Sequence, residues 1–358
     1  MDKLILVGGF LGSGKTTLLA EAANRLAKQG KSVGLVTNDQ APELVDTRLL
    51  TSAGNNKHWG VSELAGSCFC CNFNGFVNSV KSLTGKGATI IIAEPVGSCT
   101  DLTATIVHPL KKFQPDWKLA PLTVLVDPKR LPEILGNENS IVDPDALYIM
   151  ELQMAESDRI LVSKSDLLSD AEKRDIQSQL EKRYPGKKIG FISSKSGDGF
   201  DAWLSEIQSA TDVGSTIVPV DYDRYAHGEA VLGWLNATAT VTPNADGKRL
   251  LTDLLTAFHS EIKKTNTEVG HVKAIVNVDG KEWVGNLTSL KGDVDIRETE
   301  PKSGDAVLIL NARVQTSPEA LETLVRELCE RFGITINTLR CLMPGRPVPT
   351  HRLAEPVE

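Results

Sequence analysis

The stretch that decides the fold is Leu4-Ile-Leu-Val-Gly-Gly-Phe-Leu-Gly-Ser-Gly-Lys-Thr-Thr17, in which an apolar run leads directly into a glycine-rich turn. Residues 9–16 fit the pattern G-x-x-x-x-G-K-[ST], which binds the phosphates of a nucleotide. The context fits as well, because an expected strand precedes the turn and residues 16–28 follow with the apolar spacing of a helix. A ligand-free glycine turn is therefore disfavoured, and a nucleotide-binding domain is predicted.

The chemistry of this loop assigns a role to each of its residues. The backbone N–H groups and the positive end of the helix dipole favour phosphate at this position. Lys15 is expected to contact the β- and γ-phosphates, and the Thr16 hydroxyl is expected to bind Mg²⁺. The nucleotide-binding residues predicted in this loop are Gly12, Ser13, Gly14, Lys15, Thr16 and Thr17.

The pattern of apolar runs extends the first domain to residue 212. Aliphatic runs alternate with helical segments such as 171–183, which predicts an α/β fold, a P-loop NTPase with a doubly wound, mostly parallel sheet. The polar, turn-rich segment 38–66 is predicted to be mobile. The expected strands are residues 4–7, 32–37, 88–93, 121–126, 159–162 and 188–192.

A different pattern follows, and it predicts a smaller α+β domain. Residues 213–230 read as a linker, residues 231–342 as the α+β C-terminal domain, and residues 343–358, which carry four prolines, as a loosely ordered tail. Helices are expected at 248–264 and 318–332. The strand-like runs are 232–241, 271–278, 282–287 and 306–314.

Composition narrows the function classes. The 358 residues carry a net charge of −7, which argues against a general nucleic-acid binder. No apolar run reaches the roughly 18 residues of a membrane span, and the chain runs straight into a strand without room for a signal peptide. Six cysteines in a chain of this length do not suggest a disulfide scaffold. A cytoplasmic protein with reduced thiols is expected.

A second motif points to guanine as the base. Ser163-Lys-Ser-Asp166 follows the strand at 159–162, where GTPases carry an Asn-Lys-x-Asp base reader. The Asp166 carboxylate can accept both N1–H and N2–H₂ of guanine, and the stem of Lys164 can cover the base. Ser193 and Ser194 resemble the supporting serine loop. The asparagine is replaced by Ser163, so guanine preference with weaker affinity is expected.

The third motif is a group of thiols, Cys68-Phe-Cys70-Cys71. Thiolates suit Zn²⁺ and can hold Cu(I), Co²⁺ or Ni²⁺. Strain normally prevents adjacent Cys70 and Cys71 from bonding to each other, but both can reach one metal ion in a turn. A tetrahedral site then needs a fourth ligand. The alternative is a set of buried or redox-sensitive thiols, since cysteine often behaves as a small hydrophobe.

Together these motifs resemble those of the CobW, HypB and UreG group of metal-handling GTPases, and most closely its CobW branch. The resemblance covers about the first 210 residues. It rests on the phosphate loop, on Gly66-Ser-Cys-Phe-Cys-Cys71, on Glu94-Pro-Val-Gly97 and on residues 151–167. It implies a low-turnover GTPase that binds GTP and GDP, that can form a nucleotide-dependent homodimer, and that delivers a metal ion or cobalamin-type cofactor to a client metalloenzyme or cofactor protein.

The resemblance also implies roles for single residues. Glu94 is expected to act through Mg²⁺ or the attacking water, and the Gly97 N–H is expected to sense the γ-phosphate. Asp39 aligns with an acidic position of the first switch, and Cys99 lies where HypB-like proteins carry a cysteine, so both are candidate metal ligands. His58 is a weaker candidate. Since no arginine finger can be identified, slow hydrolysis is expected.

Other polar residues receive structural interpretations. Asp127 is expected to cap the helix that begins near Pro128. Cys329 is expected to pack in the core, and Cys341 is assigned to no site. His227, His271 and His351 are isolated in the sequence, so solvated or core positions are expected for them.

These motifs are compatible with three functions. The first is a GTP-dependent metallochaperone or cofactor-insertion factor, in which nucleotide state controls the metal site. The second is an accessory GTPase for a corrinoid protein, in which the metal is structural. The third is an ATP-dependent kinase that uses the same phosphate loop, and the base reader disfavours it.

Overall fold

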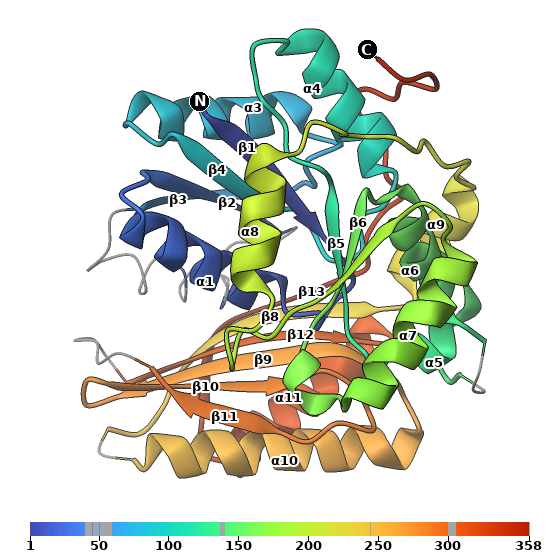
Figure 1. Ribbon diagram of the computed structural model, residues 1–358. Helices are drawn as coiled ribbons and strands as arrows, with labels where there is room; N and C mark the ends of the chain where they lie inside the picture. The colour runs from blue at the N-terminus through green and yellow to red at the C-terminus, as the bar shows by residue number, and fades with distance from the viewer. Residues whose placement is uncertain are drawn as a thin grey trace.

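The computed structural model describes residues 1–39, 45, 50, 59–136, 140–243, 245–299 and 306–357, and its strands form two separate sheets (Figure 1). The first sheet has seven strands, and the second has six. The predicted architecture, a doubly wound P-loop domain followed by a smaller α+β domain, is confirmed. The exact boundaries at residues 212, 230 and 342 stay predictions.

The first sheet is parallel at every pairing, in the order β3-β2-β4-β1-β5-β6-β7. Because parallel strands end at the same edge, the loops that follow them converge there. The strands are β1 (Lys3–Gly8), β2 (Val33–Asp39), β3 (Trp59–Ala65), β4 (Ile90–Glu94), β5 (Thr123–Val126), β6 (Arg159–Val162) and β7 (Lys188–Phe191).

Helices cover both faces of this sheet, because its central strands are apolar on both sides. Ile5 and Val7 of β1 pack with α1 (Lys15–Lys28) and α8 (Phe200–Ser209). Leu4 and Leu6 belong to the cluster on the opposite face. The other helices of this domain are α3 (Phe73–Gly85), the π-helix η1 (Thr103–Val107), α4 (His108–Phe113), α5 (Leu131–Ile134), α6 (Pro144–Glu156), the 3₁₀ turn η2 (Ser165–Leu167) and α7 (Asp170–Arg183).

The edge strand β3 was not predicted. It pairs in parallel with β2 over residues 59–65, so the expectation of a mobile segment is wrong for that part, and residues 40–44, 46–49 and 51–58 lie outside the described residues. The alternation of Trp59, Val61 and polar residues is weak because an edge strand has one pairing neighbour and exposes much of its surface. The strand predicted as third is therefore the fourth.

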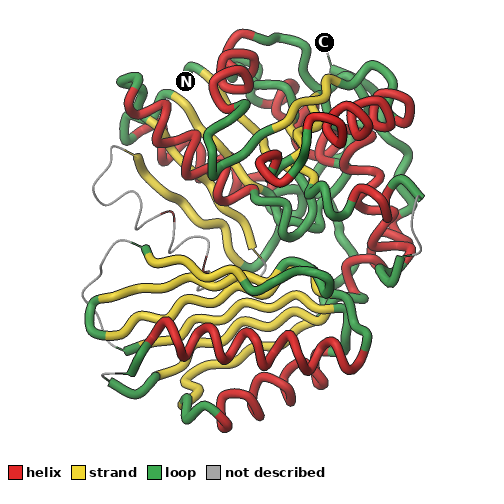
Figure 2. Tube along the Cα trace, turned by 60° about the horizontal axis from the view of Figure 1, so that its bottom comes forward, coloured by secondary structure: helices red, strands yellow, loops and turns green. Residues whose placement is uncertain are grey.

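The second sheet is antiparallel in the order β11-β10-β9-β12-β8-β13, and α10 and α11 cover one of its faces (Figure 2). The short strand β11 and the exposed edge strand β13 were missed by the sequence analysis. The elements are β8 (Gly233–Thr240), α10 (Gly247–Thr265), β9 (Val269–Val278), β10 (Lys281–Leu287), β11 (Asp295–Glu298), β12 (Val307–Val314), α11 (Pro318–Arg331) and β13 (Thr335–Leu342).

The other face of the second sheet lies toward the phosphate loop. Gly12 has φ +78°, and a Cβ on it would stand 3.0 Å from Thr288 Cβ and 3.2 Å from the Gly270 carbonyl oxygen. The guanidinium of Arg130, in the turn after β5, donates to the carbonyl oxygens of Val269 (2.7 Å) and Thr288 (3.2 Å). The C-terminal domain is thus packed directly against the nucleotide loop.

Two segments differ from their expected character. The predicted linker contains a helix, α9 (Tyr222–Ala230), which packs against α6. The expectation of a loosely ordered tail is wrong for residues 346–357, which form hydrogen bonds and ion pairs with the N-terminal domain and with α9. Its prolines exclude regular structure but do not prevent packing. None of the helices in the described part of the chain has the length and apolar character that crossing a bilayer requires.

Candidate functional site

The phosphate loop has the conformation that its glycines permit. It joins β1 to α1, with Gly14 at φ +97° immediately before the helix. The Lys15 ammonium donates to the carbonyl oxygens of Gly9 (2.7 Å) and Phe10 (3.2 Å), which holds it inside the loop. Of the other loop residues, Ser13 and Thr16 are buried and Thr17 is half-buried. The loop therefore presents its backbone and its lysine at the sheet edge.

Glu94 ends β4 beside the loop. The Thr16 hydroxyl donates to its carboxylate at 3.0 Å, and the Lys15 ammonium lies 3.9 Å from it. A hydroxyl and a carboxylate together offer the oxygen ligands that Mg²⁺ prefers, so this pair fits the expected ion. Gly97 follows closely, and a Cβ there would stand 2.7 Å from Leu11 Cδ2 and 3.1 Å from the Leu11 backbone nitrogen, so a larger residue would require Leu11 of the phosphate loop to shift.

The segment predicted to read the base lies after β6 at the same edge of the sheet. Asp166 is exposed, and its carboxylate accepts a hydrogen bond from the Ser193 hydroxyl at 2.6 Å. The Ser163 hydroxyl donates to the Val126 carbonyl oxygen at 3.2 Å, a bond that braces the neighbouring strand ends. Ser194 is exposed beside this pair. The strands thus bring both sequence segments together around one carboxylate.

Asp127 has a different role from the expected one. It does not cap a helix, because α5 begins only at Leu131. Its carboxylate instead accepts from the Lys129 N–H at 2.9 Å and pairs with the Lys164 ammonium at 2.5 Å. The ion pair fixes the side chain of Lys164, which is predicted to cover the base. No short sequence pattern indicates this pair, because its partners follow two neighbouring strands.

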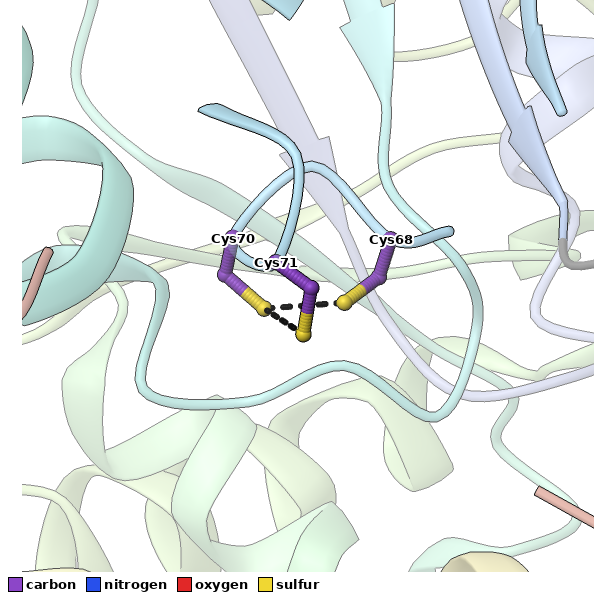
Figure 3. A group of neighbouring side chains, drawn as sticks. All are labelled: Cys68, Cys70 and Cys71. Carbon is purple, nitrogen blue, oxygen red and sulfur yellow. Dashed lines mark hydrogen bonds between the residues drawn. The ribbon is translucent and has the colours of Figure 1, made fainter. Parts of the chain in front are cut away.

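The three thiols converge in the loop between β3 and α3, where their sulfur atoms point into one space (Figure 3). Cys68 Sγ is 3.0 Å from Cys70 Sγ, which is 3.8 Å from Cys71 Sγ. Cys68 is 7% exposed and Cys70 2%. The loop reaches this shape because Asn38, at the end of β2, donates to the carbonyl oxygens of Leu64 and Ser67 and accepts from the Phe69 N–H.

Cys99 joins this group from the segment after β4. Its thiol lies near enough to those of Cys68 and Cys70 to interact with them electrostatically, although the sulfur atoms within 4.8 Å of one another are those of Cys68, Cys70 and Cys71. Bonds from Cys70, Cys71 and Cys99 lower the pKa of the Cys68 thiol, whereas the charge and bond of Cys68 raise the pKa of Cys71 to about 11. Since thiolates are the form that ligates metals, a cation bound here would displace the protons of these thiols.

The link between Cys99 and the nucleotide loop is short and braced. Gln153 of α6 donates its amide to the carbonyl oxygens of Gly97 (2.9 Å) and Cys99 (2.8 Å). The segment begins at Glu94, which lies beside Thr16, and it ends at Cys99, which lies near the other thiols. The five-residue segment therefore connects Gly97, the expected γ-phosphate sensor, to the cluster of cysteine thiols.

Two groups around the thiols escaped the sequence analysis. Glu229 and Tyr225 of α9 are both buried. Glu229 interacts electrostatically with Cys68 and Cys99, and Tyr225 interacts with these two thiols and with Cys70. The Ser98 hydroxyl donates to the Glu229 carboxylate at 2.5 Å. Burial raises the pKa of Glu229 to about 8. These residues are distant in sequence, so only the fold brings them to the site.

The remaining candidates fall elsewhere. The backbone of Asp39 ends β2, but its side chain, like all of His58, lies outside the described residues. Cys329 is buried between α11 and the second sheet, and Cys341 is half-buried on β13.

The three histidines are not isolated in the fold. The His227 ring is 2.9 Å from the Asp145 carboxylate and close to Asp143, although Arg224 already pairs with Asp145. His271 is buried near Lys15, and His351 packs on Phe73. Their neighbours come from distant segments.

Glu156, at the end of α6, anchors the segment that follows Cys99. Its buried carboxyl accepts from the Thr100 hydroxyl (2.9 Å) and the Thr103 N–H (2.8 Å), and burial raises its pKa to about 8. The unfolded chain ionises this group near the ordinary value of 4.5. The contribution of Glu156 to the free energy of unfolding therefore falls as the pH rises from 4.5 to about 8, and it does not recover above pH 8.

Glu156→Gln should remove this penalty, because an amide can donate to Thr100 and accept from Thr103 without ionising. We expect unfolding free energies close to wild type at pH 5 and higher by about 1–4 kcal/mol at pH 9. Urea denaturation at both pH values measures this, with Glu151→Gln on the same helix as control. An equal loss of stability at both pH values would contradict the interpretation.

Comparison with known proteins places the chain in a family. The family model described as CobW/HypB/UreG, nucleotide-binding domain, matches residues 3–190. A search of curated proteins gives no match. Among solved structures, the chain is similar to Zn(II)-bound YjiA GTPase from E. coli, with 14% identity, coverage of 91% of this chain and 98% of that chain, and a TM-score of 0.37. It is also similar to HypB from Helicobacter pylori in complex with nickel, with 18% identity, coverage of 56% and 83%, and a TM-score of 0.40.

Proposed function

The chain belongs to the CobW/HypB/UreG family, and on that basis we propose that it is a GTP-binding, slowly GTP-hydrolysing metallochaperone or cofactor-insertion factor. Its cargo is Zn²⁺, or Co²⁺ or Ni²⁺, held by Cys68, Cys70, Cys71 and Cys99. Asp39 stays a candidate ligand. The recipient is a client metalloenzyme or cofactor protein in the cytoplasm, and GTP favours a homodimer.

One observation carries this proposal: the segment that leaves Glu94 beside Thr16 reaches the thiols at Cys99 only five residues later. A change at the γ-phosphate that moves Gly97 also moves Cys99, because Gln153 bonds to both carbonyl oxygens. Metal affinity and nucleotide affinity are then coupled, and linkage requires the coupling to be reciprocal.

Hydrolysis in this proposal depends on positioning and charge rather than on a covalent intermediate. Lys15 neutralises charge on the β- and γ-phosphates, and the Gly97 N–H donates to the γ-phosphate. Mg²⁺, held by Thr16 and Glu94, supplies further charge neutralisation when bound. Asp166, Ser163 and Lys164 hold guanine, with Ser193 and Ser194 as the supporting loop.

Metal titration in two nucleotide states tests the coupling. Zn²⁺, Co²⁺ and Ni²⁺ are each titrated into the protein saturated with GDP or with a non-hydrolysable GTP analogue, against a competing chelator. We expect the dissociation constant of at least one metal to differ by about 5- to 150-fold between the states, the usual range of allosteric coupling.

Equal affinities for all three metals would contradict the switch and favour the second candidate, an accessory GTPase for a corrinoid protein with a structural metal site. The buried position of Cys68 and Cys70 is the observation that keeps this candidate open, since structural sites are closed.

A further inference from the structure

The last described residues, 346–357, form a strap that leaves the second sheet and runs back along the N-terminal domain. Its end lies beside α4 in Figure 1. The Leu353 N–H donates to the Ala104 carbonyl oxygen at 3.0 Å, and the Val357 N–H donates to His108 Nδ1 at 3.0 Å. The strap thus follows the segment that begins at Cys99 and continues into η1 and α4.

The same strap holds the thiol loop directly. The Thr350 N–H donates to the Cys70 carbonyl oxygen at 2.8 Å, and the Thr350 hydroxyl donates to the Cys71 carbonyl oxygen at 2.9 Å. One residue of the strap therefore forms hydrogen bonds to the backbone of two cysteines.

Arg352 of the strap contacts the segment that follows Cys99. The Arg352 guanidinium donates to the Asp101 carboxylate at 2.7 Å and to the Val218 carbonyl oxygen at 3.3 Å. Asp101 has φ +63°, an uncommon conformation for a residue with a side chain, and its carboxylate also accepts from the Tyr222 hydroxyl. Asp101 is buried, so these partners fix its backbone two residues from Cys99.

The strap also packs against the start of α3, the helix that follows the thiols. The ring of His351 packs edge-on against Phe73, with ring centroids 5.1 Å apart, and against Phe113. Cys68 and Cys70 are buried and Cys71 is half-buried, so a metal ion bound by all three lies partly beneath the segments packed around them. The other segments are a helix, α9, and the braced segment after β4. The strap has no helix or strand, so it can leave without breaking either.

We propose that the strap is a positioning element and gate of the thiol metal site: Thr350 fixes the ligating conformation of the cysteine loop, and release of the strap admits or frees the metal ion. This inference rests on the proposed function, because it assumes that the thiols bind metal. Partners of metal ligands of this kind commonly change metal affinity by about 10- to 100-fold when they are mutated.

The test compares metal binding and release in three variants. Thr350→Val removes the hydroxyl but keeps the size of the side chain, Thr350→Ser keeps the hydroxyl, and a third variant ends at Gly345. Glu355→Gln, an exposed strap residue, is the matched control. The readouts are the thiolate-to-cobalt absorption of the Co²⁺-loaded protein, the Zn²⁺ dissociation constant, and the rate of Zn²⁺ loss to a chelator. Nucleotide binding checks that each variant is folded.

We expect Thr350→Val to weaken Zn²⁺ binding about tenfold and to alter the cobalt spectrum, and Thr350→Ser and Glu355→Gln to behave as wild type. The shortened chain should lose Zn²⁺ at least about tenfold faster. Wild-type spectra and release rates in both Thr350→Val and the shortened chain would overturn the strap proposal alone. A wild-type protein that binds no more metal than its triple-cysteine variant would overturn the proposed function and the strap proposal with it. Should the shortened chain fail to fold, Thr350→Val decides.

Discussion

Replacement of Cys68, Cys70 and Cys71 together by alanine is expected to abolish tight Zn²⁺ binding and to leave GTP binding largely intact. The three thiols lie within 4.8 Å of one another, so they supply most ligands of one site. The affinity should fall by more than about 1,000-fold, because binding at thiol-rich zinc sites is worth about 10 kcal/mol or more. Isothermal titration and metal analysis of the dialysed protein measure the loss.

Cysteines elsewhere in the chain provide the control for this variant. Cys341→Ala on β13 changes a half-buried thiol outside the group and should keep full metal stoichiometry. Cys99→Ala should weaken binding without abolishing it, because three thiols remain. Unchanged stoichiometry in the triple variant would refute the assignment of the site, whereas lost nucleotide binding would show that the loop is needed for folding of the domain.

The second large effect is expected at the predicted binding site of the guanine base. Asp166→Asn should weaken GTP binding by about 100-fold or more, because the amide cannot replace a carboxylate that accepts both N1–H and N2–H₂ of guanine. Xanthine carries an oxygen where guanine carries the N2 amino group, and the Asn amide can donate to it. Affinity for xanthosine triphosphate should therefore rise in the same variant. Competition with a fluorescent GDP analogue measures both changes.

Asp198→Asn is the matched control, since this exposed carboxylate lies in the loop that carries Ser193 but pairs with Ser196. It should leave both affinities unchanged. A preference of the wild-type protein for ATP over GTP would contradict guanine recognition and favour a kinase. An Asp166→Asn variant with wild-type GTP affinity would show that the base is held elsewhere.

The main elements of the fold could be predicted because they carry strong local signals. The run from Leu4 to Thr17 combines a buried strand, a glycine turn and a helix start, and each buried strand of the first sheet is an aliphatic run. The amphipathic helices α10 and α11 were found for the same reason. Edge strands β3, β11 and β13 were missed, because their exposed faces weaken the alternation of apolar and polar residues.

The residues of the candidate site also fall into those that a local motif predicts and those that only the fold brings together. The motifs alone named Lys15, Thr16, Asp166 and the cysteine group, since each lies within a short pattern whose spacing is set by local backbone geometry. They did not give the partners of these residues. The pairing of Asp127 with Lys164, the packing of Glu229 near the thiols and the bonds from Thr350 to the cysteine loop join segments 37 to 279 residues apart.

The sequence by itself therefore determined that this chain binds a nucleotide through a phosphate loop and carries thiols suited to a metal ion. Only the tertiary structure placed Cys99, five residues after Glu94, near the other thiols on a segment braced by Gln153. It also brought Glu229 of α9 near the thiols and bonded Thr350 to the backbone of Cys70 and Cys71. Local motifs record the chemistry of single loops. Contacts between distant segments depend on how strands and helices pack, and no short pattern in the chain encodes that packing.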